Sequence, residues 1–222
     1  MLFMSTTFES LPTEKTITTS SRYTIRQVET EEEREAVYRF RYKVYIEEMG
    51  RPQKYADHTN RRICEPLDDK AIIIAAFDSN QNIIGTVRKN FASDGDLGFY
   101  QEWYGMAEYA GNSHPKYTSI TTKMMISPEY RNTYLIARMS IYIYVKTFER
   151  EALFDFIDCN HHLEKFFTGL GYYRYRDEIY HHEYGQVIPM VGSVRDLSHL
   201  KNIKSPLAKH CEELLTRHLK EN

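Results

Sequence analysis

Five charged residues lie at the ends of predicted elements in the first half of the chain. Arg41 and Glu48 lie on a predicted helix, and Glu65 and Asp68 follow on the next loop. Arg88 closes a strand of apolar residues, where an unpaired charge is costly, so we expect it to pair with Glu65 or Asp68. A carboxylate in such a site can accept the proton of an amine. Asp68 is therefore the best candidate for a catalytic base or an amine anchor, with Glu65 and Arg88 as its catalytic neighbours.

The same residues also have ordinary structural interpretations. Composition alone favours Arg41 and Glu48 as part of a solvated helix face. Glu65 and Asp68 can be turn residues, since Asp is favoured in loops. In that case the charged cluster supports a nearby site and is not itself catalytic.

The helix that carries the first of these residues has a clear start. Thr30-Glu31-Glu32-Glu33 is a capping box, in which a hydroxyl and a carboxylate satisfy each other's backbone amides. Gly50 and Pro52 end the helix. Helical spacing then places four candidate residues on one stripe beside an apolar stripe: Tyr38, Arg41, Tyr45 and Glu48.

The remaining pattern predicts alternating strands and helices. Residues 1–21 are rich in Ser and Thr and predict a flexible leader, followed by a single domain over residues 22–222. We expect an α/β fold with a central mixed sheet and helices on both faces. Strands are predicted at 23–28, 71–77, 83–88, 119–126, 154–158, 172–175 and 183–190, and helices around 99–106, at 132–150, at 161–168 and from Ser205 onward.

Composition restricts the class of protein. The chain has 222 residues, 41% of them hydrophobic and 27% charged, which is typical of one soluble globular domain. A net charge of −2 gives no electrostatic argument for binding nucleic acid or an anionic membrane. No segment has the length of a membrane span or a signal peptide.

Cysteine and histidine usage predicts neither disulfides nor a metal site. The three cysteines are odd in number and lack C-x-x-C spacing, which fits a reducing cytoplasm. The pairs His161–His162 and His181–His182 are adjacent in sequence, so their side chains diverge and one pair cannot chelate an ion.

The middle of the chain has a pattern suited to acyl transfer from a thioester. That reaction requires a polarised carbonyl, an amine that loses a proton and a thiol that leaves. Backbone amides at a strand end or a helix N-terminus supply the polarising donors. Here a predicted strand ends at Ile126, and a helix follows the loop that begins at Arg131. This order resembles the GNAT superfamily, whose Arg/Gln-x-x-Gly-x-Gly/Ala loop binds the pyrophosphate of its cofactor.

The resemblance implies a thioester co-substrate, either acyl-CoA or acyl-phosphopantetheine on acyl carrier protein. Arg131 matches the first residue of the family's loop, whereas Tyr134 and Ile136 stand where the family has glycine. Side chains at these positions hinder the approach of a pyrophosphate, which weakens the case for acetyl-CoA as the natural donor. The resemblance assigns donor binding to Met125, Ile126, Ser127, Arg131, Asn132 and Thr133.

A later segment, residues 160–172, resembles a second GNAT motif. Phe167 falls where many members carry the Tyr that protonates the leaving thiolate. Phe has no proton to give, so either solvent protonates the thiolate or the thiolate leaves unaided.

Spacing in the first half resembles one branch of the superfamily, the acyl-homoserine lactone synthases and N-acyl amino acid synthases. These enzymes carry an Arg and an aromatic residue on the first helix, then Glu/Asp-x-x-Asp, then Gly-Thr/Ser-x-Arg. The resemblance assigns Arg41, Tyr45, Glu48 and Lys123 to substrate binding. Lys123 replaces an Arg of the lactone synthases, so the N-acyl amino acid synthases are the better match. The residues that match are Arg41, Tyr45, Glu65, Asp68, Gly85 to Arg88 and Thr122 to Ile126.

Three functions therefore stay open. The first is an N-acyltransferase that moves an acyl group from acyl carrier protein or CoA to an amino acid or a similar small amine. The second is an ordinary CoA-dependent acetyltransferase with a degenerate loop. The third is a non-catalytic module that binds an acyl thioester or a partner protein. The acceptor, the acyl chain length and the oligomeric state do not follow from the sequence.

Overall fold

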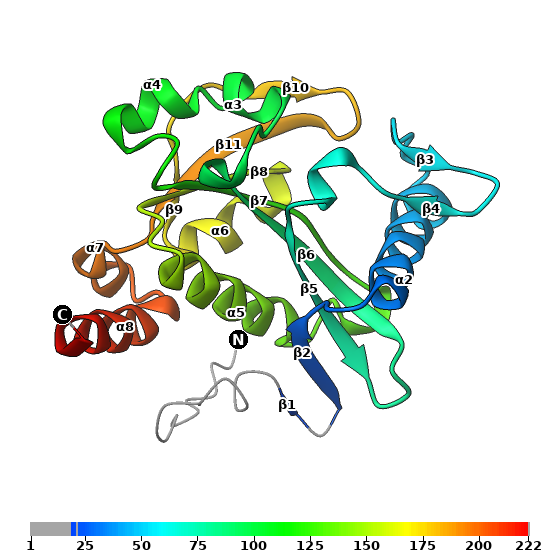
Figure 1. The fold of residues 1–222 in the computed structure, drawn as a ribbon, viewed down its shortest axis with the longest axis horizontal. Helices are drawn as coiled ribbons and strands as arrows, with labels where there is room; N and C mark the ends of the chain where they lie inside the picture. Colours follow the sequence, from blue (N-terminus) through cyan, green and yellow to red (C-terminus); the bar gives the residue numbers. More distant parts are fainter. Residues whose placement is uncertain (1–18, 21, 222) are drawn as a thin grey trace.

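The computed structural model describes residues 19–20 and 22–221, which form helices around a large twisted sheet (Figure 1). Within these residues the sheet has nine strands in the order β1-β2-β5-β6-β7-β8-β11-β10, with β9 paired to β11. A separate ribbon consists of β3 (Ala56–Asp57) and β4 (Arg62–Ile63). The strands of the large sheet are β1 (Thr19–Ser20), β2 (Tyr23–Gln27), β5 (Ile72–Asp78), β6 (Ile83–Phe91), β7 (Thr118–Ile126), β8 (Phe154–Cys159), β9 (Tyr172–Arg174), β10 (Ile179–His181) and β11 (Gly185–Ser193).

Helices connect and cover these strands. The first helix, α2 (Glu31–Tyr42), continues directly into a π-helical segment, η1 (Lys43–Glu48). The other α-helices are α3 (Phe99–Trp103), α4 (Met106–Ala110), α5 (Leu135–Glu149), α6 (Glu164–Leu170), α7 (Leu197–Asn202) and α8 (Leu207–Glu221). Short 3-10 turns are η2 (Pro66–Asp68), η3 (Ala92–Asp94), η4 (Gly111–Ser113), η5 (Pro128–Tyr130) and η6 (His161–Leu163).

The alternation of β5 shows why helices pack on both faces of the sheet. Ile73, Ala75 and Phe77 pack in a cluster with Val37 and Tyr38 of α2. The intervening residues Ile74 and Ala76 pack with α5, through Leu135, Met139, Tyr142 and Ile143. Successive side chains of a strand point to opposite faces, so one apolar strand supplies two cores. The predicted mixed sheet with helices on both faces is confirmed.

Two neighbouring strands separate in the middle of the sheet. β7 and β8 are the parallel pair among the described strands, and their pairing covers only Thr118–Ile120 and Phe154–Phe156. Beyond Ile120 and Phe156 the two strands continue without pairing to each other. The edges of β7 and β8 that face each other there are left without a strand partner.

A β-bulge lies on the part of β7 that pairs with β6 but no longer with β8. Thr86 pairs with Met125 and Arg88 pairs with Thr122, so Val87 of β6 is opposite two residues, Lys123 and Met124. Lys123 has a φ of 54°, in the left-handed region that a residue with a side chain rarely adopts. The bulge therefore changes the direction of the Lys123 side chain at the point where the strands separate.

Most of the predicted elements are present, with a few differences. The capping box of Thr30 and Glu33 is formed. The predicted helix 132–150 is confirmed as α5. The ribbon β3–β4, the strand β10 and the helix α7 were not predicted. Residues 19–20 of the predicted leader pair with β2 as β1, and residues 1–18 and 21 lie outside the described part of the chain.

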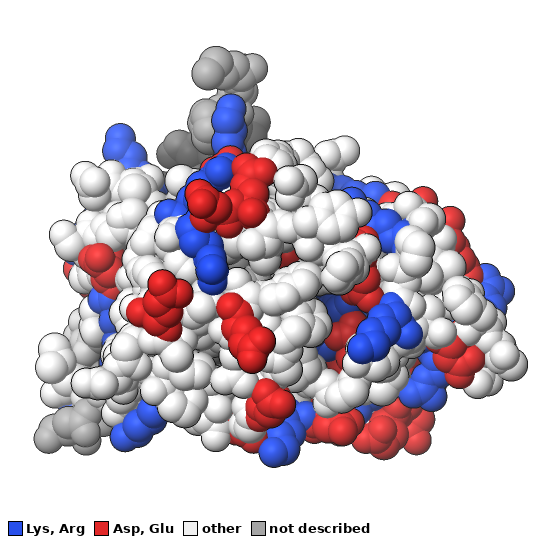
Figure 2. Space-filling view, turned by 90° about the horizontal axis from the view of Figure 1, so that it is seen from above, with Lys and Arg blue, Asp and Glu red and all other residues white. Residues whose placement is uncertain are grey.

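No described helix has the length and apolar character needed to cross a membrane. On the face that Figure 2 shows, acidic and basic side chains are mixed, and neither sign forms a continuous area.

Candidate active site

A buried ionic cluster joins α2, η2 and β6. The Nη1 atom of Arg41 lies 2.8 Å from both carboxylate oxygens of Asp68. The Nη1 atom of Arg88 lies 2.6 Å from Oε2 of Glu65 and 3.4 Å from Oδ1 of Asp68. The side chains of Arg41, Asp68 and Arg88 are completely buried. The predicted pairing of Arg88 with Glu65 and Asp68 is thereby confirmed, and the solvated-face interpretation is wrong for Arg41.

Local sequence explains how the two carboxylates are held. Pro66 is at the first position of the 3-10 turn η2, where its fixed φ fits and no N–H is required. The backbone N–H of Glu65 donates to Oδ2 of Asp68 over 2.8 Å, which closes the turn. The spacing Glu-x-x-Asp thus follows from one hydrogen-bonded turn.

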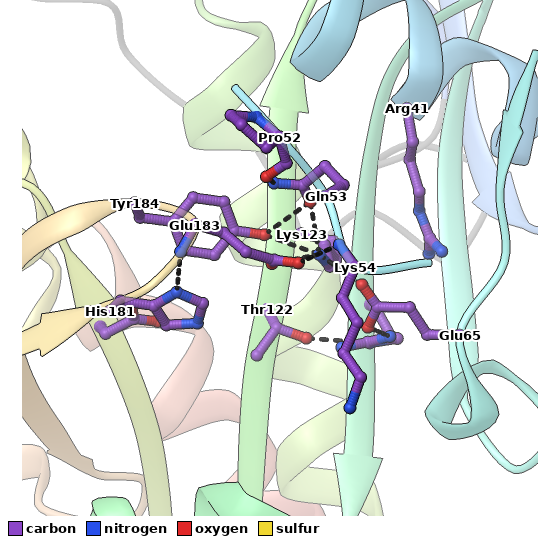
Figure 3. Close-up of polar contacts among 12 residues, drawn as sticks. Arg41, Pro52, Gln53, Lys54, Glu65, Thr122, Lys123, His181, Glu183 and Tyr184 are labelled. Atoms are coloured by element: carbon purple, nitrogen blue, oxygen red, sulfur yellow. Dashed lines mark hydrogen bonds and ion pairs between the residues drawn. The ribbon is translucent and has the colours of Figure 1, made fainter. Parts of the chain in front are cut away.

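Lys123 extends this cluster toward the separated strands (Figure 3). Its Nζ atom lies 2.5 Å from Oε1 of Glu65, donates to the Tyr184 hydroxyl at 2.6 Å, and donates to Oε1 of Gln53 at 3.2 Å. A second carboxylate lies near Lys123, because its Nζ atom is 3.8 Å from Oε2 of Glu183. Glu65 therefore holds Arg88 with one oxygen and Lys123 with the other.

The ionisation of Glu65 follows from these contacts. Burial by itself opposes ionisation, but the charges of Lys123 and Arg88 outweigh that effect and lower the pKa of Glu65 to about 2. Glu65 is therefore a carboxylate at neutral pH, committed to two cations. A group with so low a pKa is a weak proton acceptor.

Asp68 is poorly placed for the role that the sequence suggested. Its side chain has no exposed surface, and it accepts hydrogen bonds from Arg41, Arg88 and the Glu65 amide. An amine cannot reach it without displacing one of these donors. Its geometry favours a positioning role, in which Asp68 orients Arg41 and Arg88.

A cleft of about 380 Å³ opens where β7 and β8 separate. Its walls are mainly apolar and come from η1, β7, α5, β8, η6, α6 and β11. Tyr45 and Lys123 of the predicted acceptor residues lie in its wall, next to Tyr184. The apolar lining includes Val44, Met49, Met124, Met125, Ile126, Ile136, Ile157, Leu163, Phe167 and Val187.

Glu48 lies away from the other predicted acceptor residues. It is at the surface, where its carboxylate pairs with Arg131 at 2.5 Å. The reason is the π-helix η1, in which the Met49 amide bonds to the Val44 carbonyl, an i→i+5 contact. This wider turn changes the helical register after Tyr45. The predicted stripe therefore loses Glu48, and the solvated interpretation is correct for this residue.

The predicted donor residues divide into two groups. Met125, Ile126 and Arg131 line the cleft, whereas Ser127, Asn132 and Thr133 are not among its lining residues. Arg131 also donates from Nε to the Ile126 carbonyl at 3.0 Å, which fixes the loop against the end of β7. The predicted use of the Ser127 amide is at odds with its bond to the Ile84 carbonyl at 2.8 Å.

The departures in the loop have a structural counterpart. Tyr134, which stands at a glycine position of the GNAT loop, is 78% exposed and precedes α5. Ile136, at the other glycine position, lines the cleft. The first turn of α5 is thus crowded by side chains where the family's loop has none.

Two cleft residues argue against protonation of the thiolate by a tyrosine and against an acyl-enzyme on cysteine. Phe167 lies in the wall, so the predicted position of the thiolate-protonating Tyr is in the cleft but holds no hydroxyl. Cys159 also lines the cleft, but burial raises the pKa of its thiol to about 12. A thiol with this pKa is not a nucleophile at neutral pH, which favours direct attack by the amine.

Sequence reasoning missed four polar residues near the cleft: Gln53, Asp158, Glu183 and Tyr184. Three of them lie in loops or turns whose return to the site depends on long-range folding. Asp158 had a weak signal, because it follows Phe154 and Phe156 on the same face of β8 and is the charged residue on that face.

Comparison with known proteins agrees with this geometry. Residues 40–140 match the family model described as the acetyltransferase (GNAT) domain. A search of curated proteins found no match. The match covers somewhat less than half of the chain, and the described residues have a mixed α/β fold like that of the GNAT proteins.

Several solved structures share this fold. FeeM, an N-acyl amino acid synthase from uncultured soil microbes, is similar with a TM-score of 0.66 and 15% identity, over 85% of this chain and 98% of that one. BjaI, a CoA-dependent acyl-homoserine lactone synthase, is similar with a TM-score of 0.65 and 12% identity, over 83% of this chain and 90% of that one. LasI, an acyl-homoserine lactone synthase, is similar with a TM-score of 0.58 and 10% identity, over 78% of this chain and 89% of that one. At these identities the likeness shows the fold.

Proposed function

We propose that this enzyme transfers a medium or long acyl chain from a thioester to the amine of an amino acid or a related small metabolite. The thioester is carried by acyl carrier protein or by CoA. The observation that carries the proposal is the apolar cleft between β7 and β8, which meets a buried polar cluster at Lys123. Such a site can hold a hydrocarbon chain and a charged acceptor on two sides of one carbonyl.

The donor binds along the unpaired edges of β7 and β8. Main-chain groups without a strand partner can bond to the amides of a phosphopantetheine arm, as an added strand does. The cleft volume of about 380 Å³ lies within the range of small-molecule sites, and its apolar walls favour a hydrocarbon. Met125, Ile126 and Arg131 are the donor-binding residues at this edge.

The acceptor binds on the α2 side of β7. Tyr45, Lys123 and Tyr184 face the cleft there, and a supporting layer lies behind them. In that layer Asp68 orients Arg88, Arg88 orients Glu65, and Glu65 orients Lys123. Arg41 completes the layer through Asp68. These residues act by positioning the groups that contact the acceptor.

The reaction proceeds by direct attack of the amine on the thioester carbonyl, without an acyl-enzyme. We place it in the cytoplasm, where the three free thiols of the chain stay reduced. Because Phe167 has no hydroxyl, solvent supplies the proton that the leaving thiolate takes up.

Donor chain length tests this function against ordinary acetyl transfer. The purified enzyme is given acetyl-CoA or decanoyl-CoA with a mixture of the twenty standard amino acids, and thiol release and acylated products are measured. We expect decanoyl-CoA to be the better donor by kcat/KM. A higher kcat/KM for acetyl-CoA would contradict the proposal, since the apolar cleft would then have no hydrocarbon to hold.

A further inference from the structure

Among the residues that the structure describes, one carboxylate in the cleft wall has no ion-pair partner. Asp158 is on β8, two residues beyond Phe156, the last residue that pairs with β7. It lines the cleft and is half-buried, in contrast to the enclosed Asp68. The strand separation therefore presents Asp158 to the cleft in which, under the proposed function, the thioester and the amine meet.

The hydrogen bonds of Asp158 leave it available to a substrate. The Tyr104 hydroxyl donates to Oδ1 at 2.8 Å, and among the described residues this is the side-chain hydrogen bond that Asp158 receives. Tyr104 is itself held in place, because the Tyr175 hydroxyl donates to its carbonyl at 2.6 Å. One oxygen is thus fixed by a neutral donor, and the carboxylate is oriented without losing its capacity to accept a proton.

The other acidic residues nearby are committed to cations or amides. Glu65 is shared between Arg88 and Lys123. Glu183 accepts from the Lys54 amide at 2.8 Å and lies 3.8 Å from Lys123. Asp158 is the cleft-lining carboxylate that is not ion-paired in the described structure.

We propose that Asp158 is the general base that removes a proton from the acceptor's amine, an assignment that rests on the proposed acyl transfer. Its carboxylate takes one proton from the ammonium group. The nitrogen lone pair then forms the C–N bond with the thioester carbonyl carbon, and the C–S bond breaks with its electron pair leaving on sulfur. The second nitrogen proton is lost to solvent, and the thiolate takes up a proton from solvent.

The surroundings of Asp158 suit this role. Burial raises its pKa, while the Tyr104 hydrogen bond and the charges of His181 and Lys123 partly oppose that change. A base is most effective when its pKa approaches the working pH. The titratable groups that interact electrostatically with Asp158 are Tyr45, Tyr100, Tyr104, Tyr175, His181 and Lys123 on neighbouring elements, and Cys159 beside it on β8.

Kinetics of isosteric variants test the assignment. Decanoyl-CoA and the twenty standard amino acids are the probe substrates, and product formation is followed by mass spectrometry between pH 5 and 9. Asp158→Asn keeps an acceptor for Tyr104, so we expect a loss of kcat of about 100-fold or more with little change in KM. Asp177→Asn, which alters an exposed carboxylate, is the control and should retain wild-type activity.

The pH profile separates a base from a merely structural residue. In the wild type, activity should fall at acid pH as Asp158 becomes protonated. Tyr104→Phe removes a hydrogen bond that favours the charged form, so this acid limb should move to higher pH. Asp158→Asn should lack the limb. An Asp158→Asn enzyme within about threefold of wild type, with its acid limb intact, would overturn the assignment.

Direct titration gives a readout that does not depend on turnover. In protein labelled with ¹³C at the aspartate carboxyl carbons, the Asp158 signal is the one missing in Asp158→Asn. Its midpoint should lie above the ordinary value of about 3.9, and higher still in Tyr104→Phe. A midpoint at or below the ordinary value would overturn the assignment. Absence of any product from the wild type would instead reject the proposed function and the base together, which distinguishes the two failures.

Discussion

At the scale of single residues, the site depends on charges that are buried in matched sets. Arg88 has no exposed surface, and its partners Glu65 and Asp68 are themselves engaged with Lys123 and Arg41. Removing one member of such a set leaves another charge buried without compensation, and that penalty exceeds the net value of the pair. The supporting layer behind the cleft is therefore sensitive to every single substitution.

Arg88→Met tests this at one position. We expect the free energy of unfolding to fall by about 3–5 kcal/mol, because Glu65 and Asp68 each lose a buried partner. Urea denaturation at pH 7 measures the change. The control is Lys201→Met, which breaks the 2.6 Å pair with Glu212, both side chains being 53% exposed; it should cost less than about 1 kcal/mol. Equal losses in the two variants would contradict the account.

At the scale of elements, the site depends on three irregularities: the π-helical turn after α2, the bulge in β7, and the separation of β7 from β8. The π-helical turn directs Tyr45 into the cleft and Glu48 out of it. The bulge in β7 directs Lys123 toward Glu65. The separation of β7 from β8 opens the cleft that Tyr45 and Lys123 line.

Sequence patterns predicted the regular parts and missed these irregular ones. The capping box and the continuous apolar run over residues 71–77 are local signals, and both correspond to observed elements. A register change from α- to π-helix has no sequence signature, so the helical stripe wrongly kept Glu48. Asp158 was not recognised as a site residue, because its place in the cleft follows from a separation of strands that only long-range pairing produces.

The cleft formed by these elements predicts how donor chain length can be changed. Phe167 on α6 lines the cleft, so Phe167→Ala should enlarge it and shift the preferred donor to longer acyl chains. Competition among acyl-CoAs of 6 to 16 carbons, read by mass spectrometry of the products, measures the shift. The truncation should also cost about 3–5 kcal/mol of stability.

A neighbouring phenylalanine provides the control for this prediction. Phe166 is on the same helix but is not among the residues that line the cleft. Phe166→Ala should therefore leave the donor preference unchanged. An identical preference in the wild type and Phe167→Ala would show that the acyl chain does not lie against α6.

At the scale of the whole molecule, the buried cluster joins α2, η2, β6 and β7, so its ionisation is coupled to global stability. Glu65 has a pKa of about 2, below its ordinary value near 4.5, because Lys123 and Arg88 outweigh the effect of burial. Its contribution is fully present above pH 4.5 and is lost as the pH falls through about 2. Acid should therefore weaken the fold through this group.

Glu65→Gln tests that linkage. Between pH 4.5 and 3 the wild type should lose stability with a contribution from Glu65 of about 1.4 kcal/mol per pH unit, and the variant should lack this contribution. Urea denaturation at a series of pH values measures the slope. Glu102→Gln, at an exposed position, is the control. Parallel slopes for the wild type and Glu65→Gln would mean that Glu65 is not held ionised by the cluster.

Mass spectrometry of lipid extracts from bacteria that express the chain tests the central claim most directly. The wild type is compared with Asp68→Ala and Arg88→Ala, with the amount of soluble protein measured for each. We predict a new N-acylated amine in the wild-type extract that is absent from both variants, and its mass would identify the acyl chain and the acceptor together. An unchanged wild-type extract from cells with abundant soluble enzyme would contradict acyl transfer to a small amine.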